Sequence, residues 1–424
     1  MQAKKHTFQN GLRLISIPLE STASVTVMVA VAAGSRYEEK YENGLAHFME
    51  HMFFKGAKRY PNTLAVSSAI DGKGGIFNAF TGNEMVAYYV KLASKHAELA
   101  CDVISDMLLH AKCSPAEIKR ERGVIIEEIN MYEDDPAAKV AENFDRLLFG
   151  NHPLGRPVAG PKKNILALQR KDFMKYRKDF YSPDNLVVVI AGDITHNQAQ
   201  QLTEKYFRFP AGKKLRDYLP FKTKQPQSCV HIHRKKTEQA HLVLGGFAYD
   251  FHHPLKYAAG LLAVILGGGM SSRLFIEVRE RRGLCYYIST HEGSYQDCGA
   301  FVTTAGVNIK QTAVAVQEIV KQYKKVAKNG VTAAELRRAK DLILGRSALS
   351  YENSFSVANL FASQELLIQE LASTEEIAKR IEAVTRAEIK EVAQALLRPD
   401  NLYLALIGPF KQGAEARFAK LLVS

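Results

Sequence analysis

The sequence predicts an α+β protein built from two similar domains. Its 424 residues allow two to four domains of ordinary size. Apolar residues make up 46% of the chain and charged residues 24%, which is typical of a folded globular protein. A stretch rich in proline, glycine and lysine over residues 210–228 divides the chain almost in half. The two halves then show a similar order of predicted strands and helices.

This stretch sets the expected domain boundaries. We predict an N-terminal domain over residues 1–212, a linker over 213–228 and a C-terminal domain over 229–424. In each half an opening strand precedes a helix that ends near glycine, and further strands and long amphipathic helices follow. The shared order indicates an old duplication, although the sequence similarity between the halves is low.

In the first half, residues 25–33 predict a buried strand. A short helix is expected over 44–54, with Asn43 as its N-cap and Gly56 as its stop. Two further strands, over residues 76–81 and 85–92, form a predicted hairpin because Gly and Asn stand between them.

The second half repeats this order with different residues. We expect a strand, a helix, two more strands and a long helix, over residues 240–247, 255–266, 286–290, 299–307 and 311–327 respectively.

Composition excludes several classes of protein. The longest apolar runs fall short of the roughly 18 to 20 residues needed to cross a bilayer, so we expect no membrane span. The first ten residues lack the features of a secretory signal or a transit peptide. Five scattered cysteines without a C-x-x-C pair argue against a disulfide framework and against a thiolate metal site. We therefore expect a cytoplasmic protein.

The formal net charge of +13 would attract nucleic acid, anionic lipid or acidic polymers. The basic residues are dispersed in short runs, however, and no nucleic-acid-binding motif accompanies them. We interpret the charge as a solvated surface and expect no nucleic-acid partner.

The segment His47-Phe48-Met49-Glu50-His51 carries the main chemical signal. Residues four apart on a helix share one face, so His47 and His51 can bind one cation together. Glu50 can reach water on that cation but is badly placed to be a third ligand, so its predicted role is general base. The order H-x-x-E-H is the inverzincin signature. Two histidines can also be plain surface residues, so the prediction requires a third ligand.

A second helix supplies that ligand. Ser114, Pro115 and Glu117 form a helix start, and the helix is expected to run to about residue 133. On it Glu121 and Glu128 lie on one face with the apolar Val124 and Ile125. A cation is the usual compensation for two carboxylates on an apolar face. Glu127 faces elsewhere, so Glu128 is the predicted ligand; the alternative is a solvated face with Glu–Lys pairs.

The sequence resembles the inverzincin zinc peptidases of family M16, the pitrilysin and mitochondrial processing peptidase type, and in particular their short bacterial branch. The resemblance spans essentially the whole chain. It is carried by the motif helix and four other segments, which read GLAHFMEHM at 44–52, GIFNAFT at 75–81, ERGVIIEE at 121–128, LGGGMSSRL at 266–274 and RERRGLCY at 279–286. The family fold implies two homologous domains, each a mostly antiparallel sheet packed with helices, that form a clamshell.

The resemblance also assigns roles to the site residues. It implies one Zn²⁺ per chain, held by His47, His51 and Glu128, and 76 residues separate His51 from Glu128, as the family pattern allows. Glu121 corresponds to a distal acid that orients a ligating histidine. Arg279 and Tyr286 match a family pair that the C-terminal domain contributes to stabilise the oxyanion. Cys285, where the family often has a small residue, is a minor departure.

By the same resemblance, the strand that includes Gly75, Phe77, Asn78 and Ala79 is an open sheet edge beside the metal. An extended peptide can add to such an edge as a further strand. We place Asn78 and Ala79 nearest the scissile bond. The alternative is an ordinary internal hairpin.

These features together predict a zinc-dependent endopeptidase that hydrolyses unfolded peptides or presequence-like segments, bound in extended form within a closed chamber. Family chains of this length pair as homodimers or with an inactive relative, and because this chain carries both residue sets we expect a homodimer. One alternative is a non-catalytic core or scaffold subunit of the same fold. The other is a binder of nucleic acid or acidic polymers driven by the net charge.

Overall fold

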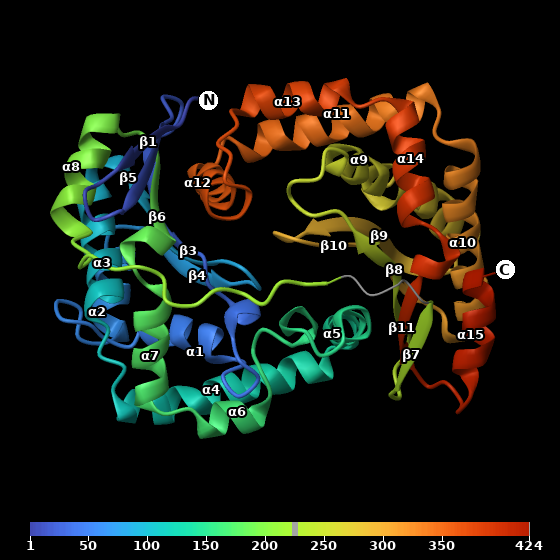
Figure 1. The fold of residues 1–424 in the computed structure, drawn as a ribbon, viewed down its shortest axis with the longest axis horizontal. Helices are drawn as coiled ribbons and strands as arrows, with labels where there is room; N and C mark the ends of the chain where they lie inside the picture. Colours follow the sequence, from blue (N-terminus) through green and yellow to red (C-terminus); the bar gives the residue numbers. More distant parts are fainter. Residues whose placement is uncertain (223–227, 424) are drawn as a thin grey trace. The chain divides into compact units, whose positions relative to one another are not determined.

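The computed structural model describes residues 1–222 and 228–423, and it folds into two compact units (Figure 1). Unit 1 comprises Met1–Ile129, Arg156–Leu219 and Ser347–Glu375, and unit 2 comprises Asn130–Gly155, Pro220–Arg346 and Glu376–Ser424. One change of unit falls inside the predicted linker, of which residues 223–227 lie outside the described residues. The units differ from the predicted domains in two internal segments that belong to the other unit.

Unit 1 contains a six-stranded sheet in the order β1-β2-β6-β3-β5-β4. Only the β2–β6 pair is parallel among these strands, and the other neighbours run antiparallel. β3 and β6 are buried on both faces, while β4 stands at the edge. The strands are β1 (Lys4–Thr7), β2 (Arg13–Pro18), β3 (Ser24–Val31), β4 (Ile76–Thr81), β5 (Val86–Ala93) and β6 (Leu186–Gly192).

Helices pack around this sheet and place the motif helix in the core. The apolar residues of α1 are fully buried, and the ring centroid of Phe48 lies 4.8 Å from that of Phe173 on α7. The helices of unit 1 are α1 (Leu45–Phe53), α2 (Thr63–Asp71), α3 (Ala97–His110), most of α4 (Pro115–Asp134), α6 (Lys162–Ala167), α7 (Arg170–Phe180), α8 (His196–Tyr206) and α12 (Ser354–Ser363).

Unit 2 repeats the sheet plan with five strands in the order β7-β11-β8-β10-β9. Its one parallel pair, β7–β11, corresponds in position to β2–β6, and its edge strand β9 corresponds to β4. The prediction of two similar domains, each with a mostly antiparallel sheet, is therefore confirmed. The strands are β7 (Cys229–Arg234), β8 (Ala240–Ala248), β9 (Cys285–Ser294), β10 (Gly299–Val307) and β11 (Tyr403–Gly408).

The second sheet is also packed with helices, and Leu261, Leu262 and Ile319 are among their fully buried side chains. The helices of unit 2 are α5 (Pro136–Phe149), α9 (Lys256–Gly267), the π-helical turn Phe275–Glu280, α10 (Thr312–Asn329), α11 (Ala333–Ser350), α13 (Thr374–Ala383), α14 (Arg386–Leu396) and α15 (Ala414–Val423), although α11 ends and α13 begins with residues of unit 1.

Each sheet receives one helix from the other half of the sequence. In unit 2, Phe144 of α5 packs in an apolar cluster with Phe247 of the second sheet. In unit 1, α12 lies against β3 and β6, where its Ser354 hydroxyl is 2.8 Å from that of Thr26. The ring of Phe355 on the same helix lies 4.3 Å from that of Tyr89. These contacts explain why residues 130–155 belong to unit 2 and residues 347–375 belong to unit 1.

The predicted elements recur with small shifts at their ends, but one helix cap was wrong. Asn43 is not the N-cap of α1, because Gly44 occupies that position and has no side chain to cap the helix. The Asn43 amide instead donates to Glu38 and to the carbonyl of Pro157. The helix start at Pro115 is as predicted, with the Glu117 amide 3.3 Å from the Ser114 hydroxyl.

Over residues 1–222 and 228–423, no helix has both the length and the hydropathy that a membrane crossing requires.

Candidate metal centre

Two helices of unit 1 carry the residues of the predicted metal site. His47, Glu50 and His51 lie on α1, where the helical spacing of four puts both imidazoles on one face, with ring centroids 4.7 Å apart. The opposite face of α1 is anchored in the core by Phe48, Met49 and Met52, which are fully buried. The helix therefore holds its polar face in a fixed direction.

α4 presents the carboxylates. Its buried residues are Ile118, Glu121, Ile125 and Ile129, so the buried face is centred on one side of Glu121. The predicted inclusion of Val124 in this face was wrong, because Val124 is 51% exposed. At 100° per residue it lies about 60° from Glu121, on the side away from Ile125. Glu128 lies at the margin of the face, half-buried, and Glu127 is exposed.

The two helices bring His47, His51 and Glu128 together. Nε2 of His47 is 3.5 Å from Oε1 of Glu128, and Nε2 of His51 is 3.6 Å from Oε2 of the same carboxylate. One ligand atom from each residue lies within 4.8 Å of the others. Ligands about 2.1 Å from a tetrahedral Zn²⁺ lie about 3.4 Å from one another, so this spacing and this N, N, O donor set fit the ion. Among the described residues no other His, Cys, Asp or Glu cluster does so.

Glu121 buttresses the site from behind. Its Oε1 is 2.9 Å from Nδ1 of His51, and its Oε2 is 2.7 Å from Nζ of Lys55. Burial raises the pKa of Glu121, but the hydrogen bonds from His51 and Lys55 outweigh that effect and bring the pKa below its ordinary value. The group is therefore a carboxylate at neutral pH. A carboxylate on Nδ1 favours the tautomer that leaves Nε2 free to bind a metal.

Glu50 is linked to the sheet edge. The hydroxyl of Thr81, the last residue of β4, donates to Oε2 of Glu50 over 2.5 Å. Side chains alternate along a strand, so Phe77 and Ala79 share the face of Thr81, and both pack against the core of unit 1. The strand thus runs beside the helix that carries the motif.

β4 is an edge strand, as the family resemblance implied. Its only neighbour in the described sheet is β5, and Asn78 pairs with Tyr89 and Ala79 with Tyr88. The strand begins after Gly75, where a Cβ atom would come within 2.3 Å of the Leu92 side chain. Within the part of the chain that the structure describes, the predicted site residues of this strand therefore have one side of their backbone without a strand partner.

Arg279 and Tyr286 belong to unit 2 and are close to each other. Arg279 lies in the π-helical turn Phe275–Glu280, and Tyr286 follows at the start of β9. The Arg279 guanidinium lies 4.6 Å from the Phe275 ring centroid and 6.0 Å from that of Tyr286, and Tyr286 is 74% exposed. The Tyr286 side chain is therefore exposed, whereas Arg279 is half-buried against Phe275, and the zinc residues all belong to unit 1.

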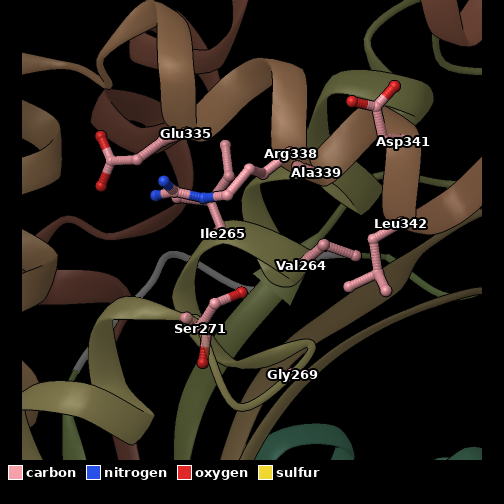
Figure 2. Close-up of a pocket in the computed structure, with 10 residues that line it drawn as sticks. Val264, Ile265, Gly269, Ser271, Glu335, Arg338, Ala339, Asp341 and Leu342 are labelled. Atoms are coloured by element: carbon pink, nitrogen blue, oxygen red, sulfur yellow. The ribbon is translucent and has the colours of Figure 1, made fainter.

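Unit 2 also contains a pocket of about 260 Å³ between α9 and α11 (Figure 2). Both acidic residues of its lining are already paired, Glu335 with Arg273 and Asp341 with Arg337. The lining combines these groups with Val264 and other apolar residues and brings no histidine or cysteine. The pocket therefore has no metal-ligand set.

Sequence reasoning missed three residues that contact the motif helix or its partners. Lys55 lies four residues after His51, a spacing that predicts a shared helix face. Thr81 ends a strand that was predicted to lie beside the metal, so its contact with Glu50 could have been predicted. Glu38 lies in an irregular loop before α1, and no local pattern in the sequence indicates its contacts.

Comparison with known proteins places the chain in a family. Residues 13–162 match the family model "Insulinase (Peptidase family M16)", and residues 167–343 match "Peptidase M16 inactive domain". An uncharacterized zinc protease of Streptomyces coelicolor is 35% identical over 98% of this chain and 91% of its own length. The uncharacterized zinc protease YmxG of Bacillus subtilis is 34% identical over 96% of this chain and 98% of its own. The chain belongs to peptidase family M16.

Solved structures share the M16 fold over nearly the full length. A protease from Helicobacter pylori superimposes with a TM-score of 0.89 at 24% identity, covering 96% of this chain and 99% of its own. A chain of Complex III2 from Candida albicans superimposes with a TM-score of 0.85 at 18% identity, covering 100% of both chains. At these identities the likeness concerns the fold alone. The zinc protease names belong to the sequence relatives, which are of the short bacterial branch.

Proposed function

We propose that this M16 chain is a zinc-dependent endopeptidase that cleaves unfolded peptides or presequence-like segments bound in extended form within a closed chamber. The observation that carries the proposal is the convergence of His47, His51 and Glu128 at tetrahedral spacing. These three residues would hold one Zn²⁺ per chain. When bound, the ion lowers the pKa of water toward about 7 and polarises a carbonyl group.

Glu50 is the proposed general base. The Thr81 hydroxyl occupies its Oε2, which leaves Oε1 to take a proton from the attacking water. The water oxygen then forms a bond to the scissile carbonyl carbon, and the C–N bond breaks. Glu50 returns the proton to the leaving amine. The Thr81 contact couples the orientation of this carboxylate to the strand beside which the peptide would lie.

Glu121 acts through His51. Its carboxylate, itself fixed by Lys55, accepts a hydrogen bond from the Nδ1–H of His51 and so directs Nε2 to the metal position. In this proposal Glu121 is a positioning residue and makes no contact with the substrate.

The free edge of β4 is the proposed peptide-binding surface. An added strand would bind through backbone hydrogen bonds, with Gly75, Phe77, Asn78 and Ala79 along it and the scissile bond nearest Asn78 and Ala79. Backbone recognition tolerates many sequences but requires an extended chain, which favours unfolded segments over folded proteins.

Arg279 and Tyr286 are the proposed stabilisers of the oxyanion, one by its charge and one by its hydroxyl donor. We further propose that the chain works as a homodimer, because it carries both the zinc set and this pair. A pairing with an inactive relative is the alternative. The cytoplasm is the proposed location, since it keeps thiols reduced and all five cysteines are free.

A non-catalytic scaffold subunit is the competing function, and this fold also occurs in a chain of Complex III2. The intact donor set favours the peptidase, because a scaffold has no use for two imidazoles and a carboxylate arranged around one point.

A digestion assay tests the proposal. The purified chain is incubated with a mixture of unstructured peptides, with and without a chelator, and its zinc content is measured. We expect cleavage that the chelator abolishes and added Zn²⁺ restores, and a Glu50→Gln variant that keeps zinc but loses turnover. A wild-type chain that binds zinc and cleaves nothing would favour the scaffold. Cleavage that persists in Glu50→Gln would remove Glu50 from the base role.

A further inference from the structure

The helix that carries the motif begins without a cap of its own. The first backbone N–H groups of any helix lack partners within the helix, and a Ser, Thr, Asp or Asn side chain at the N-cap usually accepts from them. At the N-cap of α1 stands Gly44, in the left-handed region with φ of 102°, and no side chain caps the helix from that position. α1 begins at Leu45, so His47, its third residue, lies in the first turn.

The packing around Gly44 explains why a capping side chain is excluded there. A Cβ atom on this residue would come within 2.6 Å of the carbonyl oxygen of Ala159 and 3.1 Å of the Cα of Gly160. The start of α1 is therefore pressed against a neighbouring loop, and only glycine combines this close approach with a positive φ. The cap has to come from elsewhere in the chain.

Glu38 supplies it from six residues earlier. Its Oε1 accepts the backbone N–H of Ala46 over 2.6 Å, and its Oε2 accepts that of Gly44 over 3.0 Å. The amide of Asn43 donates to Oε2 as well, over 3.0 Å. The side chain is buried, with only 3% of the residue exposed. One carboxyl group thus satisfies two N–H groups at the start of the helix.

The position of Glu38 is itself fixed from outside the motif. The guanidinium of Arg156 donates to its backbone carbonyl over 3.1 Å. The side-chain amide of Asn164 donates to the carbonyl of Asn43 over 3.1 Å and so holds the third donor in place. Burial raises the pKa of Glu38 to about 8, while the hydrogen bonds from Ala46, Asn43 and Gly44 oppose that rise. In either protonation state a carboxyl oxygen remains to accept from the helix.

We infer that Glu38 is a positioning residue that sets the place of α1 and, through it, the spacing of the two imidazoles from Glu128. The inference rests on the proposed zinc site for its functional meaning. Among the described residues, the hydrogen bonds of the Glu38 side chain go to Ala46, Gly44 and Asn43 and to none of the proposed ligands, so it acts through the first turn of the helix. His47 is the residue after Ala46, whose N–H donates the shortest of the three hydrogen bonds to Glu38.

Glu38→Gln tests the inference, with Glu39→Gln as the matched control. The substitution keeps the size of the side chain, but the new amide offers one acceptor oxygen where the carboxyl group offers two. Glu39 is the exposed neighbour, and its side chain has no hydrogen bond to α1 among the described contacts. Both variants are compared with the wild-type chain in Zn²⁺ affinity by chelator competition, in the visible spectrum of the Co²⁺ form, and in hydrogen exchange of the α1 amides without metal.

We expect Glu38→Gln to bind Zn²⁺ about tenfold more weakly, which corresponds to the loss of one typical helix cap. Its Co²⁺ spectrum should change and its α1 amides should exchange faster, while Glu39→Gln matches the wild-type chain. Should Glu38→Gln not fold, Asn43→Ala, which removes one donor, should show the same changes at smaller size. Unchanged affinity and spectrum in a folded Glu38→Gln protein would overturn the inference, whatever happens to its thermal stability.

The outcome separates this inference from the proposed function. A wild-type chain that binds no Zn²⁺ would refute the proposed peptidase function. Faster hydrogen exchange confined to α1 in Glu38→Gln would still support the positioning role of Glu38. Conversely, if the wild-type chain is an active peptidase and Glu38→Gln changes neither the hydrogen exchange of α1 nor the Zn²⁺ affinity, only the positioning role of Glu38 is refuted.

Discussion

Replacing Glu121 by Gln isolates the contribution of the carboxylate behind His51. The change keeps the shape of a side chain that is 5% exposed, and removes its charge between His51 Nδ1 at 2.9 Å and Lys55 Nζ at 2.7 Å. A hydrogen bond to a charged group contributes about 1.5 to 3 kcal/mol, and a neutral amide retains part of it. Loss of such a partner behind a metal-binding histidine typically weakens metal affinity about 10- to 100-fold.

The assay is competition for Zn²⁺ against a chromophoric chelator at fixed pH. Glu117→Gln provides the control, because Glu117 lies one turn earlier on α4 and pairs with the exposed Arg120. We expect Glu121→Gln to fall in affinity by about 10- to 100-fold, and Glu117→Gln to match the wild-type chain. Equal affinity of Glu121→Gln and wild type would refute the argument that this carboxylate sets the His51 tautomer.

Three further predictions concern other parts of the chain. Glu128→Gln should lose zinc by metal analysis while Glu127→Gln keeps it, and the reverse would show that the facing of α4 is wrong by one residue. Gly44→Ala should lower the free energy of unfolding by more than about 1 kcal/mol, because the new Cβ would lie 2.6 Å from a carbonyl oxygen at positive φ; urea unfolding at wild-type level would contradict this. Burial raises the pKa of Glu335, but the hydrogen bonds from Arg273 and Thr332 outweigh this effect and lower the pKa to about 2. Its stabilisation is therefore present above about pH 4.5 and lost as the pH falls toward 2, so Glu335→Gln should flatten this acid loss in denaturant titrations, and an unchanged slope would count against the ion pair.

The sequence was sufficient for the parts of the fold that depend on local pattern. The helix over α1, the hairpin of β4 and β5, and the capped start of α4 follow from periodicity, turn residues and capping residues. The grouping of the three proposed ligands followed from the same periodicity, since His47 and His51 lie one turn apart and Glu128 lies at the edge of a partly apolar face. Their grouping depends on the orientation of the two helices, and the pattern of buried residues fixes that orientation.

The exchanged segments could not be predicted in the same way. The apolar faces of α5 and α12 indicate that each helix packs on something, but the periodicity does not say on which of two similar sheets. The choice depends on contacts such as that of Phe355 with Tyr89, which are more than 200 residues apart in the chain. The prediction of Asn43 as the N-cap of α1 was wrong for a related reason, because Gly44 takes that position through its packing against Ala159, which is a tertiary contact.

A signal of the duplication was present in the sequence and was missed. The tripeptide Pro-Asp-Asn stands before the buried strand β6 at Pro183–Asn185 and before β11 at Pro399–Asn401. The buried amide of Asn185 donates to the carbonyls of Ala32 and Phe180, and that of Asn401 donates to equivalent carbonyls in unit 2. A comparison of the two halves at these turns would have placed them in register.

X-ray absorption at the zinc edge of the metal-loaded chain tests the account most directly. The account predicts a four-coordinate ion with nitrogen and oxygen neighbours at about 2.0 to 2.1 Å, the outer scattering of two imidazoles, and loss of one imidazole in His51→Ala. A spectrum dominated by sulfur at about 2.3 Å, or one that keeps both imidazoles in His51→Ala, would contradict the assignment.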